Sequence, residues 1–396
     1  EERREKREER RERRRVSQPP DVVARSRSSS FSSTSMKTRE RENENDKTIT
    51  VVIVGASFAG SRVARLLRQH TASSSQGEHL DLEVVLLDSK PYWEYTPSSL
   101  RCLVQPDWAN STCFKHREDL VLTDKVVRIV CEEGEGKEEE ETDTEGGDED
   151  RRERKMVVLA SGKKIPFHFC VIATGSTYPA PVKSFEQEEE EGEGGGDKRA
   201  TTAIMSDALE RRKETFRSWR KKIDEASRVV ILGGGSVGVE LAGEIAGQFR
   251  GKKKVVLCSK SSRILSSSQM TEKASRYCHA WLEKRNVEIR LNQQELDDPM
   301  PNDLLFRCFG AKPNLQSFIC PPGLRMSEKE GVEVSSTMQS VSHNSIFAVG
   351  DVARSSFEKT AFSADVQATV AARNIIRLSK RLLVREKKGE EEDQRS

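Results

Sequence analysis

Two short glycine-rich stretches have the residue types needed to hold a phosphate group. The first reads VVIVGASFAG over residues 51–60, and the second reads VVILGGGSVG over residues 229–238. The second stretch completes the pattern G-x-G-x-x-G with Gly233, Gly235 and Gly238, and Ser236 lies inside it. The pattern predicts a tight turn between a strand and a helix, whose free backbone N–H groups bind the pyrophosphate of a dinucleotide.

The first stretch carries serine where the pattern has its middle glycine. Three interpretations are open: a working phosphate loop, a decayed loop, or an ordinary turn between a strand and a helix. Serine is small, and its hydroxyl can itself hydrogen-bond a phosphate oxygen. The intact second copy favours a working loop, so the candidate contacts are Gly55, Ala56, Ser57, Phe58, Ala59 and Gly60.

The sequence around the two stretches repeats the same order of elements. An apolar run precedes each turn, and after the second turn apolar residues recur every four positions, at Val237, Leu241 and Ile245. Such spacing is typical of the buried face of a helix. A later strand ends in glycine in each half, at Ala173-Thr174-Gly175 and at Phe309-Gly310. The repeat predicts an α/β fold with two related, Rossmann-like domains.

The first half supplies an acid where a ribose would bind. The run LEVVLL is followed by Asp88, and a carboxylate at this place usually hydrogen-bonds ribose hydroxyls. The spacing from Gly60 is longer than usual, and we assign the excess to a polar loop over Thr71–His79. The alternative is that Asp88 only ends a strand.

The second half lacks this acid. Ser259, Lys260, Ser261 and Arg263 stand there instead. Because serine and basic side chains accommodate the 2′-phosphate of NADPH, we predict that NADPH is at least tolerated beside NADH. The alternative is that Lys260 and Arg263 are ordinary surface charges.

Composition sets limits on the remaining chain. Of the 396 residues 33% are charged, yet the net charge is only +2. The charge and serine content are concentrated in residues 1–15, 26–35, 132–150 and 186–197, and such segments bury too little apolar surface to fold. The near-balance of Glu and Arg in the first block favours a solvated tail over nucleic-acid or lipid contact, so no nucleic-acid partner is expected. No apolar run is long enough for a transmembrane helix.

Cysteine and histidine spacing argues against disulfide and metal chemistry. None of the eight cysteines forms a C-x-x-C or C-x-x-x-x-C pair, and the six histidines are scattered. We therefore expect no metal site and reduced, buried cysteines in an intracellular protein, in the cytoplasm first and in an organelle as the alternative.

A third motif, NSIFAVGDVA over residues 344–353, completes a family pattern. Together with both glycine turns and VIATGS, it resembles the pyridine nucleotide-disulphide oxidoreductase superfamily of FAD- and NAD(P)H-dependent flavoproteins. GGGSVGVELAGEI, DSKPYWEYTPSSLR and KTAFSADVQATVAARNI are most similar to apoptosis-inducing-factor-like (ferroptosis-suppressor-type) quinone reductases and type II NADH dehydrogenases. The resemblance covers about residues 48–378.

The resemblance implies an NAD(P)H-binding domain inserted into an FAD-binding domain. The expected parts are a disordered, targeting-like tail over 1–47, FAD-binding segments over 48–176 and 310–384, the NAD(P)H-binding domain over 177–309, and a charged tail over 385–396. Disordered acidic insertions are expected over 132–152 and 186–199.

The resemblance also assigns roles to single residues. The expected FAD contacts, besides the first glycine turn, are Asp88, Ser89, Lys90, Val126, Ala173, Thr174, Gly175, Gly350, Asp351, Thr360 and Ala361. The expected NAD(P)H contacts are Gly233, Gly235, Ser236, Gly238, Ser259, Lys260 and Gly310. Catalytic positions beside the reacting rings are expected at Tyr95, Pro97 and Glu240.

Several of these roles have structural alternatives. Asp351 can be a helix N-cap, Glu240 a first-turn acid, and Tyr95 a core or interface aromatic residue. In addition, His168 stands where relatives often carry Asp before the VIATG strand, so a local hydrogen bond is expected to differ.

The resulting expectation is an FAD-dependent NAD(P)H oxidoreductase that passes electrons to a quinone-like acceptor or oxygen. The alternative is a flavin-binding, redox-sensing interaction protein with little turnover. Residues 374–388 mix apolar and basic side chains; they form either an interfacial helix for peripheral membrane contact or a helix packed on the core.

Overall fold

The computed structural model describes residues 48–73, 80–131, 155–179, 181–183, 207–267 and 270–393. The predicted tail over 1–47 and the insertions over 132–152 and 186–199 lie outside these residues. The domain boundaries predicted above stay predictions.

The first glycine turn belongs to a parallel sheet with the strand order β18-β9-β1-β2-β5. Its strands are β1 (Ile49–Val54), β2 (Leu82–Asp88), β5 (Leu122–Thr123), β9 (Phe169–Ile172) and β18 (Ile346–Ala348). Val51 in β1 lies opposite Val84 in β2 and Phe169 in β9. The side chains of the central strands are apolar and buried on both faces, as is usual for a parallel sheet.

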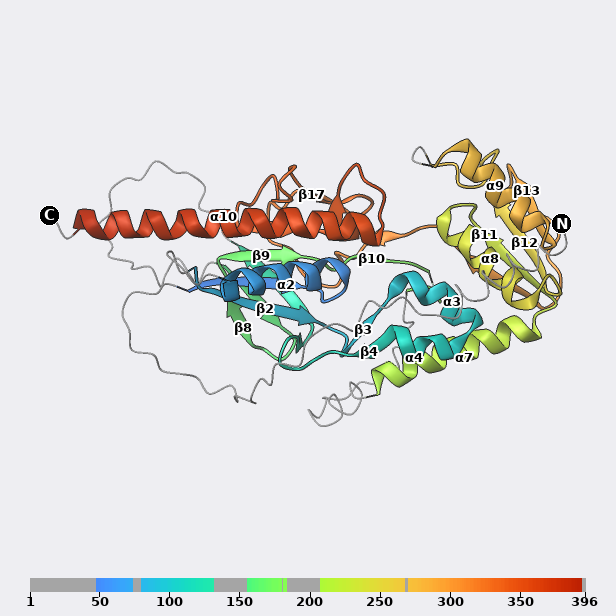
Figure 1. The fold of residues 1–396 in the computed structure, drawn as a ribbon, viewed down its shortest axis with the longest axis horizontal. Helices are drawn as coiled ribbons and strands as arrows, with labels where there is room; N and C mark the ends of the chain where they lie inside the picture. The colour runs from blue at the N-terminus through green and yellow to red at the C-terminus, as the bar shows by residue number, and fades with distance from the viewer. Residues whose placement is uncertain are drawn as a thin grey trace, which may run out of the picture. The chain divides into compact units, whose positions relative to one another are not determined.

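Two helices cover one face of this sheet and lie side by side (Figure 1). They are α2 (Phe58–Ser73) and α10 (Ala361–Asp393). In α10 the buried positions facing α2 and the sheet are mostly small: Ala364, Ala368, Ala371, Ala372 and Ile375. Small side chains let the two helices approach closely. Against the other face pack β6 (Val126–Cys131), β7 (Lys155–Leu159) and β8 (Lys164–Pro166), which form an antiparallel sheet.

Both helices are longer than the sequence predicted. Residues 71–73 of the expected polar loop are the last residues of α2. Helix α10 continues to Asp393, through much of the expected charged tail. In residues 374–388, Ile375 is fully buried and Ile376, Leu378, Leu382 and Leu383 pack against the same core, which is the core-packing alternative.

The second glycine turn belongs to a second parallel sheet with the order β13-β12-β11-β14. Its strands are β11 (Arg228–Leu232), β12 (Lys254–Ser259), β13 (Val287–Leu291) and β14 (Asp303–Arg307). Helices α7 (Ala208–Glu225), α8 (Ser236–Phe249) and α9 (Glu272–Glu283) contribute to its core.

The order of strands shows that the second sheet is inserted into the first. Strand β18 follows the whole second sheet in sequence, yet it pairs with β9, which precedes that sheet. The two connecting segments meet as the antiparallel pair of β10 (Ser176–Thr177) and β15 (Lys312–Pro313). The two-domain α/β fold with an insertion is therefore confirmed.

Smaller elements complete the structure. A hairpin of β3 (Tyr92–Glu94) and β4 (Cys113–Lys115) encloses η1 (Thr96–Ser98), α3 (Ser99–Val104), η2 (Pro106–Trp108) and α4 (Ala109–Thr112). Strands β16 (Met326–Ser327), β17 (Gly331–Glu333) and β19 (Ala353–Arg354) form a small sheet, with η3 (Gly350–Val352) before β19.

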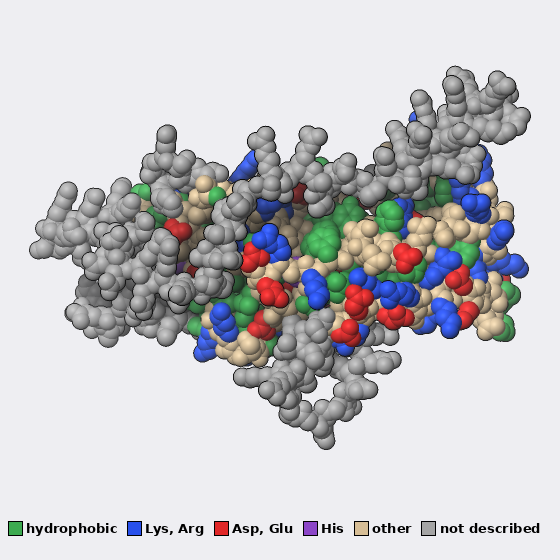
Figure 2. Space-filling view, turned by 60° about the horizontal axis from the view of Figure 1, so that its bottom comes forward, with side chains coloured by type: hydrophobic (Ala, Val, Ile, Leu, Met, Phe, Trp, Pro, Cys, Tyr) green, Lys and Arg blue, Asp and Glu red, His purple; other side chains and the backbone are tan. Residues whose placement is uncertain are grey.

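Charged groups of both signs share the surface. Figure 2 shows Lys and Arg side chains lying among Asp and Glu side chains on the face in view, with hydrophobic side chains between them. Among the described residues, no helix combines the length and the apolar character needed to span a bilayer.

Candidate functional site

The two glycine turns have the same backbone construction. Gly55 adopts φ +105° and Gly233 adopts φ +120°, in the left-handed region that favours glycine. Gly55 donates its N–H to the carbonyl of Leu87 at 2.8 Å, and Gly233 donates to the carbonyl of Cys258 at 2.9 Å. The residue that begins the turn is thus fixed to the neighbouring strand in the same way in both copies.

Close packing explains the first and last glycine of each turn. A Cβ on Gly60 would lie 1.8 Å from the carbonyl oxygen of Gly55, and a Cβ on Gly238 would lie 1.9 Å from that of Gly233. The chain that follows β9 or β14 passes directly behind each turn. A Cβ on Gly55 would lie 2.5 Å from the carbonyl oxygen of Ala173, which follows β9. A Cβ on Gly233 would likewise lie 2.8 Å from the Cys308 oxygen.

The middle position of the turn follows a different rule. Gly235 has φ −78°, and a Cβ there would meet no atom within 4 Å. The fold therefore does not require glycine at this position. Ser57 occupies the corresponding position of the first turn, so the serine leaves the construction of that turn intact.

The carboxylate of Asp88 is bound to the first turn. It accepts a hydrogen bond from the N–H of Ala56 at 2.8 Å and another from the N–H of Lys90 at 2.9 Å. Asp88 ends β2, beside the place where a dinucleotide ribose is expected. The Lys90 ammonium lies 5.3 Å from the ring centre of Tyr92. Ser89 lies between Asp88 and Lys90 in the chain.

In the second half the corresponding residue is Ser259. It follows Cys258 as Asp88 follows Leu87, and its hydroxyl is close to Gly234, where a Cβ would lie 2.5 Å away. Ser259 is buried, and Lys260 beside it is exposed. The guanidinium of Arg263 donates to the carbonyl oxygens of Leu265 and Met270, so Arg263 holds its own loop.

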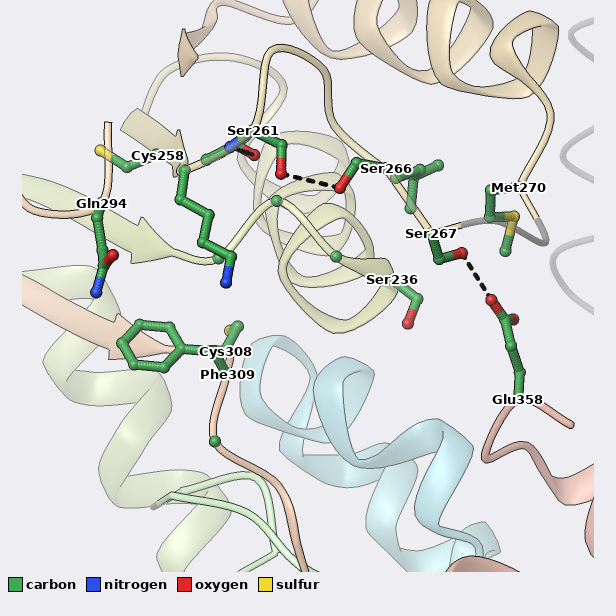
Figure 3. A pocket seen from close by; sticks show the side chains of 17 residues that line it. Ser236, Cys258, Ser261, Ser266, Ser267, Met270, Gln294, Cys308, Phe309 and Glu358 are labelled. Atoms are coloured by element: carbon green, nitrogen blue, oxygen red, sulfur yellow. Dashed lines mark hydrogen bonds between the residues drawn. The ribbon is translucent and has the colours of Figure 1, made fainter. Parts of the chain in front are cut away.

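A pocket of about 550 Å³ opens at the second turn (Figure 3). Lys260 lines it together with the glycine turn, Ser236 at the start of α8, and Phe309 and Gly310 after β14. Two hydrogen bonds mark its rim: Ser266 to Ser261 at 3.0 Å, and Ser267 to Glu358 at 2.7 Å. Every predicted NAD(P)H contact except the buried Gly238 lines this pocket.

Asp351 and the start of α10 lie close together in the first half. Asp351 lies within η3 and accepts from the hydroxyl of Ser176 at 2.6 Å and the ammonium of Lys183 at 3.3 Å. Its carboxylate thus binds side chains, in contrast to the N-cap alternative. At α10, the N–H of Ser363 donates to the hydroxyl of Thr360 at 3.1 Å, so Thr360 caps the helix that Ala361 begins.

A second link holds η3 against α10. The N–H of Gly350 donates to the side-chain oxygen of Gln367 at 2.7 Å, and Gln367 donates onward to Ser355 at 3.1 Å. Gln367 is buried. The loop after β18 and the helix N-terminus are therefore one connected unit.

Of the predicted catalytic residues, Tyr95 and Pro97 lie at η1 and Glu240 lies in α8. Tyr95 is 40% exposed and Pro97 lies in η1. Glu240 is the fifth residue of α8, beyond its first turn, in contrast to the first-turn alternative. Partial burial raises the pKa of Glu240, the nearby Glu244 raises it further, and Arg101 lowers it. Arg101 also pairs with Glu244 at 3.0 Å and so joins α3 to α8.

The remaining predicted contacts take up supporting positions. The Val126 side chain is buried in the core, so only its backbone is available to a ligand. Thr174 donates to the carbonyl oxygen of Asn314 at 2.7 Å. Gly175 and Gly310 follow β9 and β14 and adopt φ +72° and +83°. The two halves are therefore alike at this point too.

His168 is hydrogen-bonded twice to Thr50 in β1. Its Nδ1 accepts from the backbone N–H of Thr50 at 2.9 Å, and its backbone N–H donates to the Thr50 carbonyl at 2.9 Å. The imidazole thus takes part in the link between His168 and β1.

Sequence reasoning missed three residues near these sites: His116, Lys183 and Glu358. Each comes from a segment distant in sequence from the turn that it approaches, and no motif marks it. The described residues contain no cluster of metal-ligating side chains, and all eight cysteines are free.

Comparison with known proteins agrees with this geometry. The model of the pyridine nucleotide-disulphide oxidoreductase family matches residues 49–372, and the chain belongs to this family. It is therefore an NAD(P)H-dependent flavoprotein oxidoreductase by class, in a family whose members use FAD and NAD(P)H.

Similar curated proteins share most of their length with the chain. Ferroptosis suppressor protein 1 of Xenopus laevis is 26% identical over 348 residues, which are 82% of this chain and 79% of that protein. Apoptosis-inducing factor homolog A of Dictyostelium discoideum is 25% identical over 361 residues, 83% of this chain and 76% of the homolog.

Solved structures with the same fold cover a similar share. NADH:rubredoxin oxidoreductase from Clostridium acetobutylicum has a TM-score of 0.53 at 20% identity, covering 83% of this chain and 75% of that one. The putidaredoxin reductase–putidaredoxin complex gives 0.54 at 22%, with the same coverage.

Proposed function

We propose that the first glycine turn binds FAD, that the second binds NADH or NADPH, and that the enzyme passes electrons to a quinone-like acceptor. One observation carries the assignment of the two sites. The turns share their backbone construction, but only the first has a carboxylate at the end of the second strand. Asp88 suits an unmodified ribose, whereas the pocket beside Ser259 and Lys260 admits a phosphorylated one.

The residues of the first half fit FAD. Gly55 and Gly60 allow the tight turn that places backbone N–H groups at the end of β1. Asp88 keeps acceptor capacity beyond its two backbone donors. The buried Nε2 of His116, for which the described residues offer no hydrogen-bond partner, lies 3.9 Å from an oxygen of that carboxylate. When bound, FAD supplies the chemistry that takes a hydride from NAD(P)H and releases electrons to a second acceptor.

The chain contributes binding, orientation and charge. The N-terminus of α2 would offer backbone N–H groups to the pyrophosphate of FAD. The N-terminus of α10, capped by Thr360, would offer positive potential to a flavin that gains charge on reduction. We place Glu240, on α8 after the second turn, at the nicotinamide end of the second site. Its carboxylate stabilises the positive charge that the nicotinamide ring gains as it is oxidised.

The burial of Cys102 and Cys113 favours a diffusible electron acceptor over disulfide exchange through these two thiols. Burial raises the pKa of Cys102, and burial raises that of Cys113 to about 12, so both remain thiols near neutral pH. Both sulfur atoms lie near the hydroxyl of Thr112, at 3.5 and 4.0 Å. A thiol that does not ionise is a poor nucleophile.

A cluster of four aromatic side chains supports the proposal of a flat, quinone-like acceptor. Phe58, Tyr95 and Trp93 lie in mutual contact with ring centres 5.4 to 5.9 Å apart, and Trp93 stacks on Phe114 at 4.9 Å. Phe114 is 50% exposed. Because Phe58 begins α2 directly after the first turn, this group joins the flavin loop to the surface.

We place this reaction in a reducing, intracellular compartment, since all eight cysteines are free. For residues 374–388 we favour packing on the core over peripheral membrane contact, because Ile375, Ile376, Leu378, Leu382 and Leu383 pack there.

The proposal is tested by steady-state oxidation of NADH and NADPH with a short-chain quinone, a disulfide substrate and oxygen as separate acceptors. We expect quinone to give the fastest turnover. Flavin that is reduced once and then turns over with none of these acceptors would instead support the redox-sensing interaction protein.

A further inference from the structure

The imidazole of His116 lies beside Asp88 with one nitrogen unused. His116 follows β4, and its backbone N–H donates to the carbonyl of Pro91 at 3.0 Å, which holds the backbone that carries the ring. Its Nε2 lies 3.9 Å from Oδ2 of Asp88, and the two side chains are only 7% and 10% exposed. This nitrogen is buried and has no hydrogen-bond partner among the described residues.

The separation between the two atoms is informative. A direct hydrogen bond requires about 2.7–3.2 Å, so 3.9 Å is too long. One hydroxyl oxygen placed about 2.8 Å from both atoms closes the gap, with an angle of about 90° at that oxygen. Such a hydroxyl donates to the carboxylate and accepts from the imidazole N–H, and Asp88 retains a lone pair for it.

We propose that Asp88 and His116 together bind one ribose hydroxyl of the dinucleotide at the first glycine turn, with His116 as the N–H donor. The inference rests on the assignment of FAD to this turn and adds a cofactor-binding residue, His116, that the glycine pattern does not contain. It also accounts for the unused nitrogen: a buried N–H without a partner costs free energy, which the hydroxyl relieves.

The charge state agrees with this role. Burial lowers the pKa of His116; the Asp88 carboxylate raises it, and the Lys90 ammonium lowers it. The balance is a lowered pKa, so the ring is neutral at neutral pH. The nearby carboxylate favours the tautomer that carries hydrogen on Nε2.

The second turn provides a contrast. Ser259 stands at the position of Asp88, and the described residues that line its pocket include no histidine. Among the described residues, a carboxylate paired with a histidine therefore lies at the first turn and not at the second. A phosphate on that ribose would meet the Asp88 carboxylate, so the site selects the unmodified ribose of FAD.

The test uses the full chain, freed of flavin and titrated with FAD and with two analogues whose adenosine ribose lacks the 2′- or the 3′-hydroxyl. We expect His116→Phe to raise the dissociation constant for FAD about tenfold, the effect of one hydrogen bond to a buried partner. Wild-type protein should bind one of the two analogues about tenfold more weakly than FAD. His116→Phe should bind that analogue as tightly as it binds FAD, because the hydrogen bond is already missing.

Two further variants separate binding from folding. His116→Gln keeps an N–H donor at similar reach and should retain most of the affinity, with unchanged thermal unfolding. His279→Phe is the matched control: His279 lies on α9 and pairs with Glu283 at 3.3 Å, so FAD binding should not change.

Two results would overturn the inference. One is that His116→Phe binds FAD as tightly as wild type does. The other is that the substitution weakens the binding of FAD and of both analogues by the same factor. Wild-type protein that binds no FAD would overturn the proposed function itself, and this inference with it.

Discussion

The guanidinium of Arg212 holds the carboxylate of Glu94 with two hydrogen bonds, of 2.8 and 3.1 Å. The side chains are 1% and 9% exposed, and Ser99 donates to the same carboxylate at 2.8 Å. Arg212 also donates to the carbonyl oxygens of Pro181 and Val182 at 3.2 and 2.9 Å. One buried ion pair thus joins α7, the β3–β4 hairpin and the segment that follows β10.

Removal of one partner of this pair should destabilise the protein strongly. We expect Arg212→Met to lower the free energy of unfolding by about 3–5 kcal/mol, because the Glu94 charge stays buried without compensation. Arg217→Met is the control: its ion pair with Glu214 lies at the surface of the same helix, and the loss should stay below about 1 kcal/mol. Urea unfolding at neutral pH measures both, and equal losses would contradict a special role for Arg212.

The same pair predicts a pH dependence. Burial alone would raise the pKa of Glu94, but the charge and hydrogen bonds of Arg212 outweigh it and hold the pKa below its ordinary value. The contribution to stability is therefore complete above the unfolded pKa of about 4.3 and is lost as the pH falls through the lower folded value. The difference in stability between wild type and Glu94→Gln should be full at pH 7 and shrink below about pH 4. A difference that grows toward acid pH would contradict this sign.

Substitutions in the glycine turns should separate folding from binding. Gly235→Leu keeps an allowed φ and its Cβ lies in open space, so the protein should fold while NAD(P)H binding weakens about a hundredfold. Gly247→Leu, also in open space on α8, is the control and should bind normally. Gly238→Ala should lower the melting temperature instead, because its Cβ would overlap the Gly233 carbonyl. Flavin reduction at varied NADH concentration and thermal unfolding measure the two effects.

The serine of the first turn gives the matching test for FAD. Ser57→Leu should fold but lose co-purified FAD, because the larger side chain fills the place of the pyrophosphate. The flavin-to-protein absorbance ratio after purification is the readout. Full occupancy in this variant would show that FAD binds elsewhere.

Lys260 should set the tolerance for NADPH. We expect Lys260→Ala to raise the KM for NADPH about tenfold and to leave the KM for NADH nearly unchanged, because only NADPH carries the 2′-phosphate. Lys252→Ala removes an exposed lysine outside the pocket and serves as the control. A parallel change for both nucleotides would mean that Lys260 does not contact the 2′-phosphate.

Glu240 should shape the acid side of the pH profile. Desolvation and the nearby Glu244 raise the pKa of Glu240 above its ordinary value, while Arg101 lowers it. The ionised form stabilises charge on the nicotinamide, so kcat/KM should rise with pH through this pKa. Glu240→Gln should abolish that rise and lower kcat about tenfold, while Glu272→Gln on α9 should do neither. An unchanged profile in Glu240→Gln would remove Glu240 from the reaction.

The sequence predicted the parts of the fold that depend on local pattern. Glycines at a fixed spacing after apolar strands predicted both turns, because only glycine allows the close approach seen at Gly60 and Gly238. Ser57 made one turn look damaged, since the sequence does not show that the middle position has open space. The inserted arrangement came from family resemblance, and the pairing of β18 with β9 confirms it.

Features that depend on tertiary contact were not predictable. The ends of α2 and α10 depend on packing against each other and the sheet. Arg263 looked like a phosphate ligand, yet its guanidinium binds the carbonyls of its own loop. His116 and Arg212 are far in sequence from Asp88 and Glu94, so nothing in their local sequence indicates their roles.

The most direct test of the whole account is an anaerobic titration of the purified protein with NADH or NADPH, followed by the flavin absorbance near about 450 nm. We predict that the protein purifies with FAD, that the band bleaches promptly with reduced nucleotide, and that it recovers on addition of a soluble quinone. Protein that carries no flavin, or a flavin band that stays oxidised under excess NADH and NADPH, would contradict the account.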